Sequence, residues 1–212
     1  MLRVTEIFHS IQGESTFAGR PCVFVRLTGC PLRCTWCDTD YAFYGGREEP
    51  MDRIVDAVRA YGCPLVEVTG GEPLAQAESL ELLKTLCQEG FTVLLETSGA
   101  LDTSGVDPRV HIILDVKCPA SGMMERMHWP NVERLRSQDE AKFVVQDRVD
   151  YDWAKDVVAR FRLVERCTVL FSPVFSRLAP QHLAEWLLAD GLPIRFQLQL
   201  HKHIWAPDTR GV

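Results

Sequence analysis

The sequence predicts a single α/β domain, folded as a reduced (partial) (β/α) barrel of six or seven mainly parallel strands with few helices. Apolar runs typical of strands alternate with helix-like segments, which indicates parallel pairing through right-handed crossovers. The 212 residues contain no repeat, low-complexity tract or long linker, which fits one domain. Because periodicity alone does not separate a barrel from a doubly wound open sheet, the latter stays the alternative.

The elements follow from local patterns in chain order. Seven short apolar runs predict strands at 22–29, 65–71, 92–99, 111–117, 141–147, 168–174 and 194–200. Apolar residues at helical spacing predict helices at 51–62, 79–90, 151–161 and 181–191, and glycine follows or ends three of them. Residues 98–110 join two strands without a helical pattern, so the barrel is expected to be reduced there. The N-terminal residues 6–15 are too polar for a core strand.

Polar residues or glycines follow the apolar part of every predicted strand. In a parallel barrel the carboxyl ends of all strands share one face, and that face carries the chemistry. A plainer interpretation is that strands end in polar loops. The residues concerned are 26–30, 69–72, 96–98, Asp115, Lys117, Gln146, Ser172, Gln199 and His201.

Composition limits the classes of function. The net charge of −6 and the isoelectric point near 5.5 argue against nonspecific nucleic-acid binding, which needs a basic face. No signal-like start and no run of 18 apolar residues occurs, so a cytoplasmic location without membrane association is expected. In a reducing compartment, clustered cysteines bind metal or act in catalysis more often than they form disulfides.

Three cysteines lie in one short stretch, "GCPLRCTWCDT", directly after the first predicted strand. Cys30, Cys34 and Cys37 can ligate three irons of a cubic iron–sulfur cluster, one thiolate per iron. A zinc site needs a fourth ligand nearby, and the next cysteine, Cys63, ends a predicted helix. An open fourth iron is the simplest interpretation, with zinc as the alternative.

The spacing C-x3-C-x2-C, with Trp36 before the last cysteine, resembles the radical S-adenosylmethionine superfamily. The resemblance implies a 4Fe-4S cluster whose unique iron is chelated by the methionine part of S-adenosylmethionine. Reductive cleavage of that cofactor then yields a radical that abstracts hydrogen from the substrate. The glycines of "TGGEP" (69–73) permit close approach of a ligand at a strand end, and in the superfamily this motif binds the cofactor.

Finer motifs resemble the 7-carboxy-7-deazaguanine synthase family over nearly the whole chain. They are "EIFHSIQGES", "FVRLTGCPLRCTWCDT", "VTGGEP", "LETSG", "LDVKCPASG" and "QLHKHIW". The resemblance implies a lyase of the queuosine pathway that contracts the ring of 6-carboxy-5,6,7,8-tetrahydropterin with loss of ammonia. It also implies Mg²⁺, a homodimer, and flavodoxin or ferredoxin as electron donor. Ser15 departs from the family, which usually has glycine there.

The same resemblance assigns roles to residues, within an N-terminal substrate segment (1–20) and a C-terminal tail (201–212). Substrate binding is expected of Gln12, Gly13, Glu14, Arg26, Thr97 and His201. Cofactor binding is expected of Gly70, Gly71, Glu72, Ser98 and Lys117, magnesium binding of Thr39, and no catalytic residue is assigned beyond the cluster and its cofactor.

The chemistry of these side chains suits their roles. Arg26 can bind the substrate carboxylate with a planar donor pair, while Gln12 and Glu14 can bind the polar pterin edge. Each residue also has a purely structural interpretation, such as a barrel ion pair for Arg26 or a turn for Gln12 and Glu14. His201 and His203 are expected on one face of a strand, and the roles of His203 and Cys118 stay open.

Two other classes of function remain. A glycyl-radical activase shares the cysteine loop but acts on a protein, and it gives no role to the "QGE" and "HK" segments. A non-catalytic zinc or electron-transfer module would need only the cysteines.

Overall fold

A computed structural model describes all residues, 1–212, and contains one sheet of nine strands. The strands are β1 (Leu2–Ile11), β2 (Pro21–Leu27), β3 (Arg47–Glu49), β4 (Leu65–Gly70), β5 (Thr92–Thr97), β6 (His111–Asp115), β7 (Glu140–Val145), β8 (Thr168–Pro173) and β9 (Arg195–Phe196). The helices are α1 (Met51–Ala60), α2 (Ser79–Gln88), α3 (Pro130–Arg134), α4 (Arg148–Arg160), α5 (Pro180–Asp190) and α6 (His201–Ile204). Short 3-10 turns occupy several of the connections.

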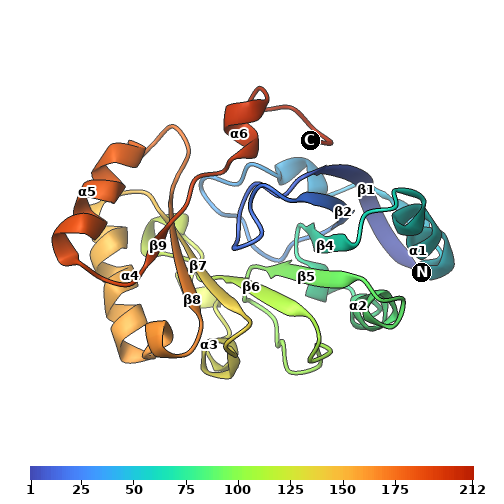
Figure 1. The fold of residues 1–212 in the computed structure, drawn as a ribbon, viewed down its shortest axis with the longest axis horizontal. Coiled ribbons are helices and arrows are strands. Elements are labelled where there is room, and N and C mark those ends of the chain that lie inside the picture. The colour runs from blue at the N-terminus through green and yellow to red at the C-terminus, as the bar shows by residue number, and fades with distance from the viewer.

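The strand order β3-β1-β2-β4-β5-β6-β7-β8-β9 shows a partial barrel. From β2 to β9 every pairing is parallel, and each new strand adds to the same edge. Right-handed crossovers that always advance in one direction place all helices on one side of the sheet, whereas a doubly wound sheet reverses direction. Figure 1 shows α1 to α5 around the outside of the curved row of strands, and α6 near the gap between β9 and the first strands.

All seven predicted strands are confirmed, although β9 contains only two residues. The expectation for residues 6–15 is wrong, because most of this stretch belongs to β1, which pairs antiparallel with β2. Its polar residues are accommodated because a neighbouring strand supplies partners, as Arg26 does for Glu6. β3, which pairs antiparallel with the other side of β1, was not predicted either.

The expected strand around the two histidines is also wrong. The sheet pairing of β9 ends at Phe196, and His201 and His203 lie in the short helix α6. In that helix the backbone N–H of Trp205 donates to the carbonyl of His201 at 3.0 Å. The alternation of side chains expected of a strand therefore does not apply to this pair.

The four predicted helices are confirmed, and they form because an apolar stripe can pack on the sheet. In α1, Ile54, Val55 and Val58 are buried. Asp147 caps the start of helix α4: its carboxylate accepts the backbone N–H groups of Val149 and Asp150 and so satisfies two free donors of the first turn. Residues 98–110 contain no helix, as predicted.

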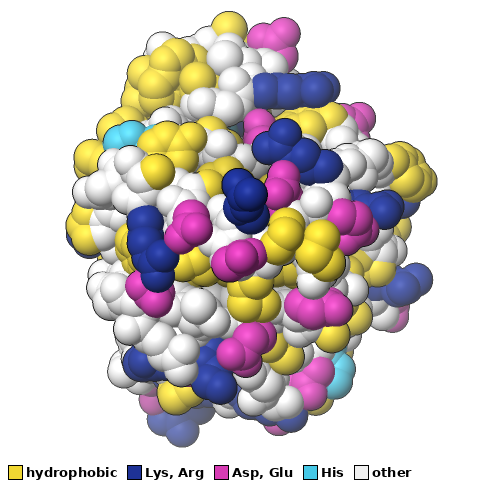
Figure 2. Space-filling view, turned by 90° about the vertical axis from the view of Figure 1, so that its right-hand side faces the viewer, with side chains coloured by type: hydrophobic (Ala, Val, Ile, Leu, Met, Phe, Trp, Pro, Cys, Tyr) yellow, Lys and Arg dark blue, Asp and Glu magenta, His cyan; other side chains and the backbone are white.

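The buried side chains form one hydrophobic core between the sheet and the helices. Cys22, Cys63 and Cys118 lie in this core, away from solvent. None of the helices is both long and apolar enough to cross a membrane. On the side of the molecule that carries α1 and α2, basic and acidic side chains are interspersed rather than segregated (Figure 2).

Candidate active site

A cavity of about 750 Å³ opens at the carboxyl ends of the parallel strands. Alternate residues of the strands point into it, because successive side chains of a strand face opposite sides of the sheet. All the predicted site residues except Glu72 line this cavity: Gln12, Gly13, Glu14, Arg26, Cys30, Cys34, Cys37, Thr39, Gly70, Gly71, Thr97, Ser98, Lys117 and His201. Gln146 and Ser172, two polar residues at other strand ends, do not line it.

The cysteine loop follows β2 and packs against the turn at residues 118–122. The backbone N–H of Thr35 donates to the carbonyl of Ser121 at 3.1 Å, and its hydroxyl donates to the carbonyl of Ala120 at 2.9 Å. From the other side, Arg177 donates to the carbonyl of Thr35 at 2.9 Å. These contacts hold the loop at the cavity wall, with Cys37 exposed.

The three thiols of the loop are free, and no group of three His, Cys, Asp or Glu side chains is arranged to hold a single metal ion. A tetrahedral zinc site would need four ligands converging on one point. A cubic cluster with one open iron needs three thiolates, one on each of the other irons. The loop supplies three free thiols, the number that such a cluster needs and one fewer than a structural zinc site.

Burial raises the pKa of the thiols of Cys30, Cys34 and Cys37 above the ordinary value. The ammonium of Lys117 acts in the opposite direction on all three. Iron binds the thiolate, so binding must displace these protons. Lys117, at the end of β6, provides positive charge where negative thiolates would gather.

The glycine turn after β4 lies directly against the start of the cysteine loop. A Cβ at Gly70 would lie 2.2 Å from the carbonyl oxygen of Leu27, and one at Gly71 would lie 2.2 Å from that of Gly29. Gly70 also has a φ of +145°, which side chains disfavour. The two glycines are thus required for the close approach of the turn and the cysteine loop.

Glu72 lies behind the cavity wall and binds the neighbouring strand end. It is fully buried, and its carboxylate accepts from the hydroxyl of Thr97 at 2.9 Å and from the backbone N–H of Ser98 at 2.8 Å. The Ser98 hydroxyl also donates to it. Glu72 therefore positions the two residues at the end of β5 that do line the cavity.

Arg26, on β2, directs a partly free guanidinium into the cavity. Its Nε donates to Glu6 at 2.7 Å, and no other protein acceptor is within hydrogen-bonding distance. Tyr41 donates to the same carboxylate at 2.8 Å. The two terminal nitrogens of Arg26 are left for a ligand, and they form the planar pair that binds a carboxylate in two places.

The loop after β1 carries the "QGE" residues. Gln12 is almost fully buried; its side-chain oxygen accepts the backbone N–H of Glu14 at 2.8 Å, and its amide nitrogen donates to Glu67. The carboxylate of Glu14 accepts from Lys142 at 2.9 Å and from Gln199 at 3.1 Å. Protein groups thus occupy both ends of the Gln12 amide, while Glu14 retains unused lone pairs.

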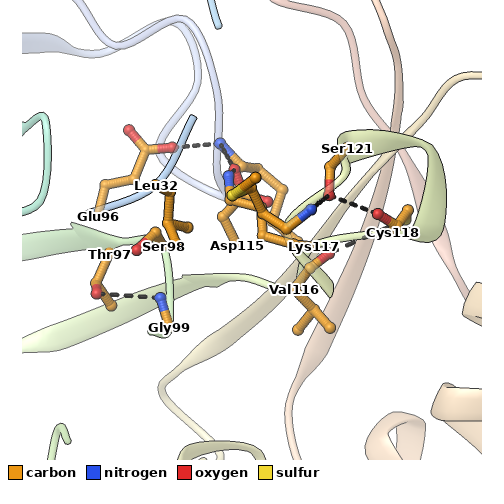
Figure 3. Close-up of polar contacts among 12 residues, drawn as sticks. Leu32, Glu96, Thr97, Ser98, Gly99, Asp115, Val116, Lys117, Cys118 and Ser121 are labelled. Carbon is orange, nitrogen blue, oxygen red and sulfur yellow. Dashed lines mark hydrogen bonds and ion pairs between the residues drawn. The ribbon is translucent and has the colours of Figure 1, made fainter. Parts of the chain in front are cut away.

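Lys142, in the middle of β7, is surrounded by carboxylates. Its ammonium contacts Glu14 and Glu96, and Asp115 lies 3.9 Å away. Asp115 also accepts from Lys117 at 2.7 Å. Figure 3 shows the side chains of Glu96, Asp115 and Lys117 pointing into the same space from neighbouring strand ends. Although burial opposes charge, the surrounding carboxylates raise the pKa of Lys142 well above its usual value.

Glu67, on β4, behaves differently from the carboxylates around Lys142. Burial, assisted by the negative charge of Glu96, raises its pKa well above the usual value. The pKa of Glu96 is lowered instead, because Lys142 outweighs the effect of burial. The surroundings therefore shift the pKa values of these two neighbouring carboxyl groups in opposite directions.

The C-terminal segment covers one side of the cavity. Lys202 forms an ion pair with Asp38, which holds the pKa of that carboxyl far below its usual value despite burial. Burial lowers the pKa of His201, which favours the neutral ring. Thr39 donates its hydroxyl to Asp38 at 3.0 Å, so the residue expected to bind magnesium lies beside a carboxylate.

Sequence reasoning missed Glu67 and Lys142, which lie inside strands rather than at their ends. The available signal was a single charge within each otherwise apolar run, "LVEVTG" and "AKFVV". Charged residues are seldom fully buried without a partner, so such a charge indicates an inward-facing ion pair. The partner itself is distant in the chain and is not visible in the pattern.

Comparison with known proteins identifies the family. A model of the Radical SAM superfamily matches residues 24–120. The chain is 50% identical to the 7-carboxy-7-deazaguanine synthase of Chlorobaculum tepidum over 100% of its own length and 97% of the relative. The chain belongs to the 7-carboxy-7-deazaguanine synthase family. The family member of Koribacter versatilis is 44% identical and that of Thermoplasma acidophilum 38%, with nearly complete coverage of both chains.

Solved structures share the fold of this chain. A crystal structure of QueE from Escherichia coli superposes with a TM-score of 0.73, at 23% identity over 94% of both chains. An archaeal TYW1 structure gives a TM-score of 0.56 at 12% identity, over 78% of this chain and 71% of that one.

The family and superfamily matches make the chain a radical S-adenosylmethionine enzyme, for which a 4Fe-4S cluster and S-adenosylmethionine are the cofactors. The activase and the non-catalytic module are not favoured.

Proposed function

We propose that this enzyme converts 6-carboxy-5,6,7,8-tetrahydropterin into 7-carboxy-7-deazaguanine with loss of ammonia, using residues of the cavity described above. The observation that carries the proposal is their convergence: the cysteine loop, the glycine turn and the free guanidinium of Arg26 line one cavity. When bound, the cluster and S-adenosylmethionine supply the one-electron chemistry that removes a hydrogen atom from the substrate.

Cys30, Cys34 and Cys37 would hold the cluster at the outer wall of the cavity. Gly70, Gly71, Ser98 and Lys117 would line the space for S-adenosylmethionine beside it, because they occupy the adjoining ends of β4, β5 and β6. Glu72 would act through Thr97 and Ser98, which its carboxylate holds in place.

The substrate would occupy the rest of the cavity, toward the loop after β1. Arg26 would bind its carboxylate with the two unused nitrogens, since a charge-assisted pair is stronger than neutral hydrogen bonds. Glu14 would accept pterin N–H groups, with Gly13, Thr97 and His201 completing the contact surface. Gln12 would hold the loop in shape, because both ends of its amide bind protein groups.

The remaining partners are proposals that the family suggests. Thr39 would bind Mg²⁺ with waters and substrate oxygens, since magnesium keeps several waters and needs few protein ligands. Flavodoxin or ferredoxin would deliver the electron near Cys37, which is exposed. The enzyme would act as a homodimer, which light scattering of the purified protein would test.

The reaction itself gives the test. Anaerobically reconstituted enzyme would be incubated with dithionite, S-adenosylmethionine, Mg²⁺ and the carboxypterin, and the products separated by chromatography with mass detection. We expect 7-carboxy-7-deazaguanine and one equivalent of ammonia. Cleavage of S-adenosylmethionine without either product would contradict the proposal and direct attention to another substrate.

A further inference from the structure

The loop after β1 is attached to the inside of the barrel at three alternate residues. Gln12 binds Glu67 of β4, Glu14 binds Lys142 of β7, and Thr16 donates its backbone N–H to Glu140 of β7 at 3.0 Å. Glu140 and Lys142 are two residues apart, so both point to the same face of the strand. Buried charged side chains thus add three contacts to the hydrogen bonds that the loop already makes with the segment after β9.

We propose that Lys142 is a positioning residue for substrate binding, which fixes the carboxylate of Glu14 toward the pterin and joins it to Glu96 and Asp115 on the cofactor side. This inference rests on the proposed function. No step of the reaction passes through Lys142, and the residue acts through the carboxylates that it contacts.

The surroundings of Lys142 leave it no other partner. Its side chain is 4% exposed and lies among carboxylates from three separate elements: Glu14 from the loop, Glu96 from β5 and Asp115 from β6. Asp115 is its direct neighbour in the register of β6 and β7. Two other cations lie near these groups, and each has its own partner: Lys117 pairs with Asp115 and Arg26 pairs with Glu6. Removing one member of such a buried group leaves the others uncompensated, which is costly.

The geometry of Glu14 explains why its orientation matters. One carboxylate oxygen accepts from Lys142 at 2.9 Å, and the other accepts from Gln199 at 3.1 Å. Two donors on opposite oxygens fix the plane of the group, while an ionised carboxylate has about four acceptor positions in all. The unused acceptor positions of Glu14 can face N–H donors of a ligand in the cavity. Without Lys142, the carboxylate of Glu14 would be free to rotate away from that orientation.

The test measures binding in the holoenzyme rather than turnover. Lys142→Gln would be titrated calorimetrically with the carboxypterin, with S-adenosylmethionine present and the cluster oxidised, so that no reaction occurs. We expect pterin affinity to fall about 30-fold, the effect of one charge-assisted hydrogen bond, while the affinity for S-adenosylmethionine changes by less than about threefold. An equal loss of both affinities would show a general structural role and overturn the proposal.

The matched control is Glu140→Gln. Glu140 is on the same face of the same strand, is equally buried and holds the same loop, but at Thr16, which does not line the cavity. We expect a lower thermal midpoint with pterin affinity within about threefold of wild type, because the loop is loosened at Thr16, outside the cavity lining. If this variant weakened pterin binding as much as Lys142→Gln, stiffness of the loop rather than Glu14 would be responsible.

A double-mutant cycle tests the route through Glu14. In a Glu14→Gln background, Lys142→Gln should cost little further pterin affinity, because the group that Lys142 positions has already changed. Additive losses would contradict the proposal.

Lys142→Arg tests the role of the positive charge. This variant keeps the cation and should recover pterin affinity to within about tenfold of wild type; pterin binding as weak as in Lys142→Gln would exclude charge as the cause.

Binding of the carboxypterin to wild type and to the Lys142 variants separates the proposed function from the role of Lys142. If the wild-type enzyme does not bind the carboxypterin, the proposed function falls and this inference with it. If wild type binds and both Lys142 variants bind equally well, only the role of Lys142 falls.

Discussion

Gly13 and His201, which are 188 positions apart, lie so close that a Cβ on Gly13 would be 2.2 Å from Nδ1 of the imidazole. The backbone agrees, since the N–H of Leu200 donates to the carbonyl of Gly13 at 2.9 Å. The loop after β1 and helix α6 therefore form one continuous wall of the cavity. This contact makes the placement of α6 depend on the absence of a side chain at position 13.

Gly13→Ala should displace α6 and lower turnover. A small misplacement of binding groups can cost about 100-fold in rate, so we expect a loss of that order, together with faster proteolysis after residue 200. Gly19→Ala is the control, because Gly19 has a φ of +89° but its Cβ would contact nothing. It should cost stability without changing proteolysis of the C-terminal segment. Equal effects of the two variants would contradict the link to α6.

Arg26→Ala should separate substrate turnover from cofactor cleavage. Loss of a two-point bond to the substrate carboxylate should reduce kcat/KM for the pterin about 100-fold or more. Reductive cleavage of S-adenosylmethionine without substrate should fall far less, so the ratio of the two losses is the measurement. Arg26→Lys keeps the charge but not the planar pair, and should recover only part of the activity. Equal losses in both assays would mean that Arg26 acts only structurally, through Glu6.

Ser15 stands where the family usually has glycine, and its φ is +63°, a left-handed conformation. Its hydroxyl accepts the backbone N–H of Phe17 at 3.1 Å, which offsets part of the strain. Ser15→Ala keeps the strain and loses the bond, so the free energy of unfolding should fall by about 1 kcal/mol. The free energy of unfolding of Ser15→Gly should stay within about 0.5 kcal/mol of the wild-type value. Glycine loses the hydrogen bond and makes the unfolded chain more flexible, but it also relieves the backbone strain, and these effects offset one another. Denaturant unfolding measures both; a larger loss for glycine would refute this explanation.

Glu67 gives a pH dependence with a definite sign. Its pKa is raised in the folded protein, so above the unfolded value of 4.5 the folded chain keeps a proton that the unfolded chain releases. This group therefore makes the protein less stable as pH rises from about 4.5 toward its raised pKa. Glu67→Gln removes the titration but can still accept the hydrogen bond from Gln12. The stability of the variant relative to wild type should grow on the order of 1 kcal/mol from pH 5 to 7. If the stability difference between Glu67→Gln and wild type stayed constant from pH 5 to 7, Glu67 would be ionised in the folded protein over this range.

The sequence predicted the part of the site that local motifs carry. The cysteine loop and the glycine turn are short, and the alternation of strands and helices placed them at neighbouring strand ends of a partial barrel. The ion pair of Lys142 with Glu14 joins residues 128 positions apart, and such pairing depends on strand order and register rather than on local pattern. Strand β1 was not predicted because the partners of its polar side chains lie on β2 and are not visible in the local pattern. Helix α6 was not predicted because its four residues show too little periodicity.

Radical chemistry in this cavity requires that Cys30, Cys34 and Cys37 hold a cluster with one iron open to S-adenosylmethionine. The decisive measurement is Mössbauer spectroscopy of ⁵⁷Fe-enriched protein prepared without air. We expect about four irons per chain, one of which changes its Mössbauer parameters when S-adenosylmethionine is added. Absence of iron, or a cluster whose four irons are all unaffected by the cofactor, would contradict it.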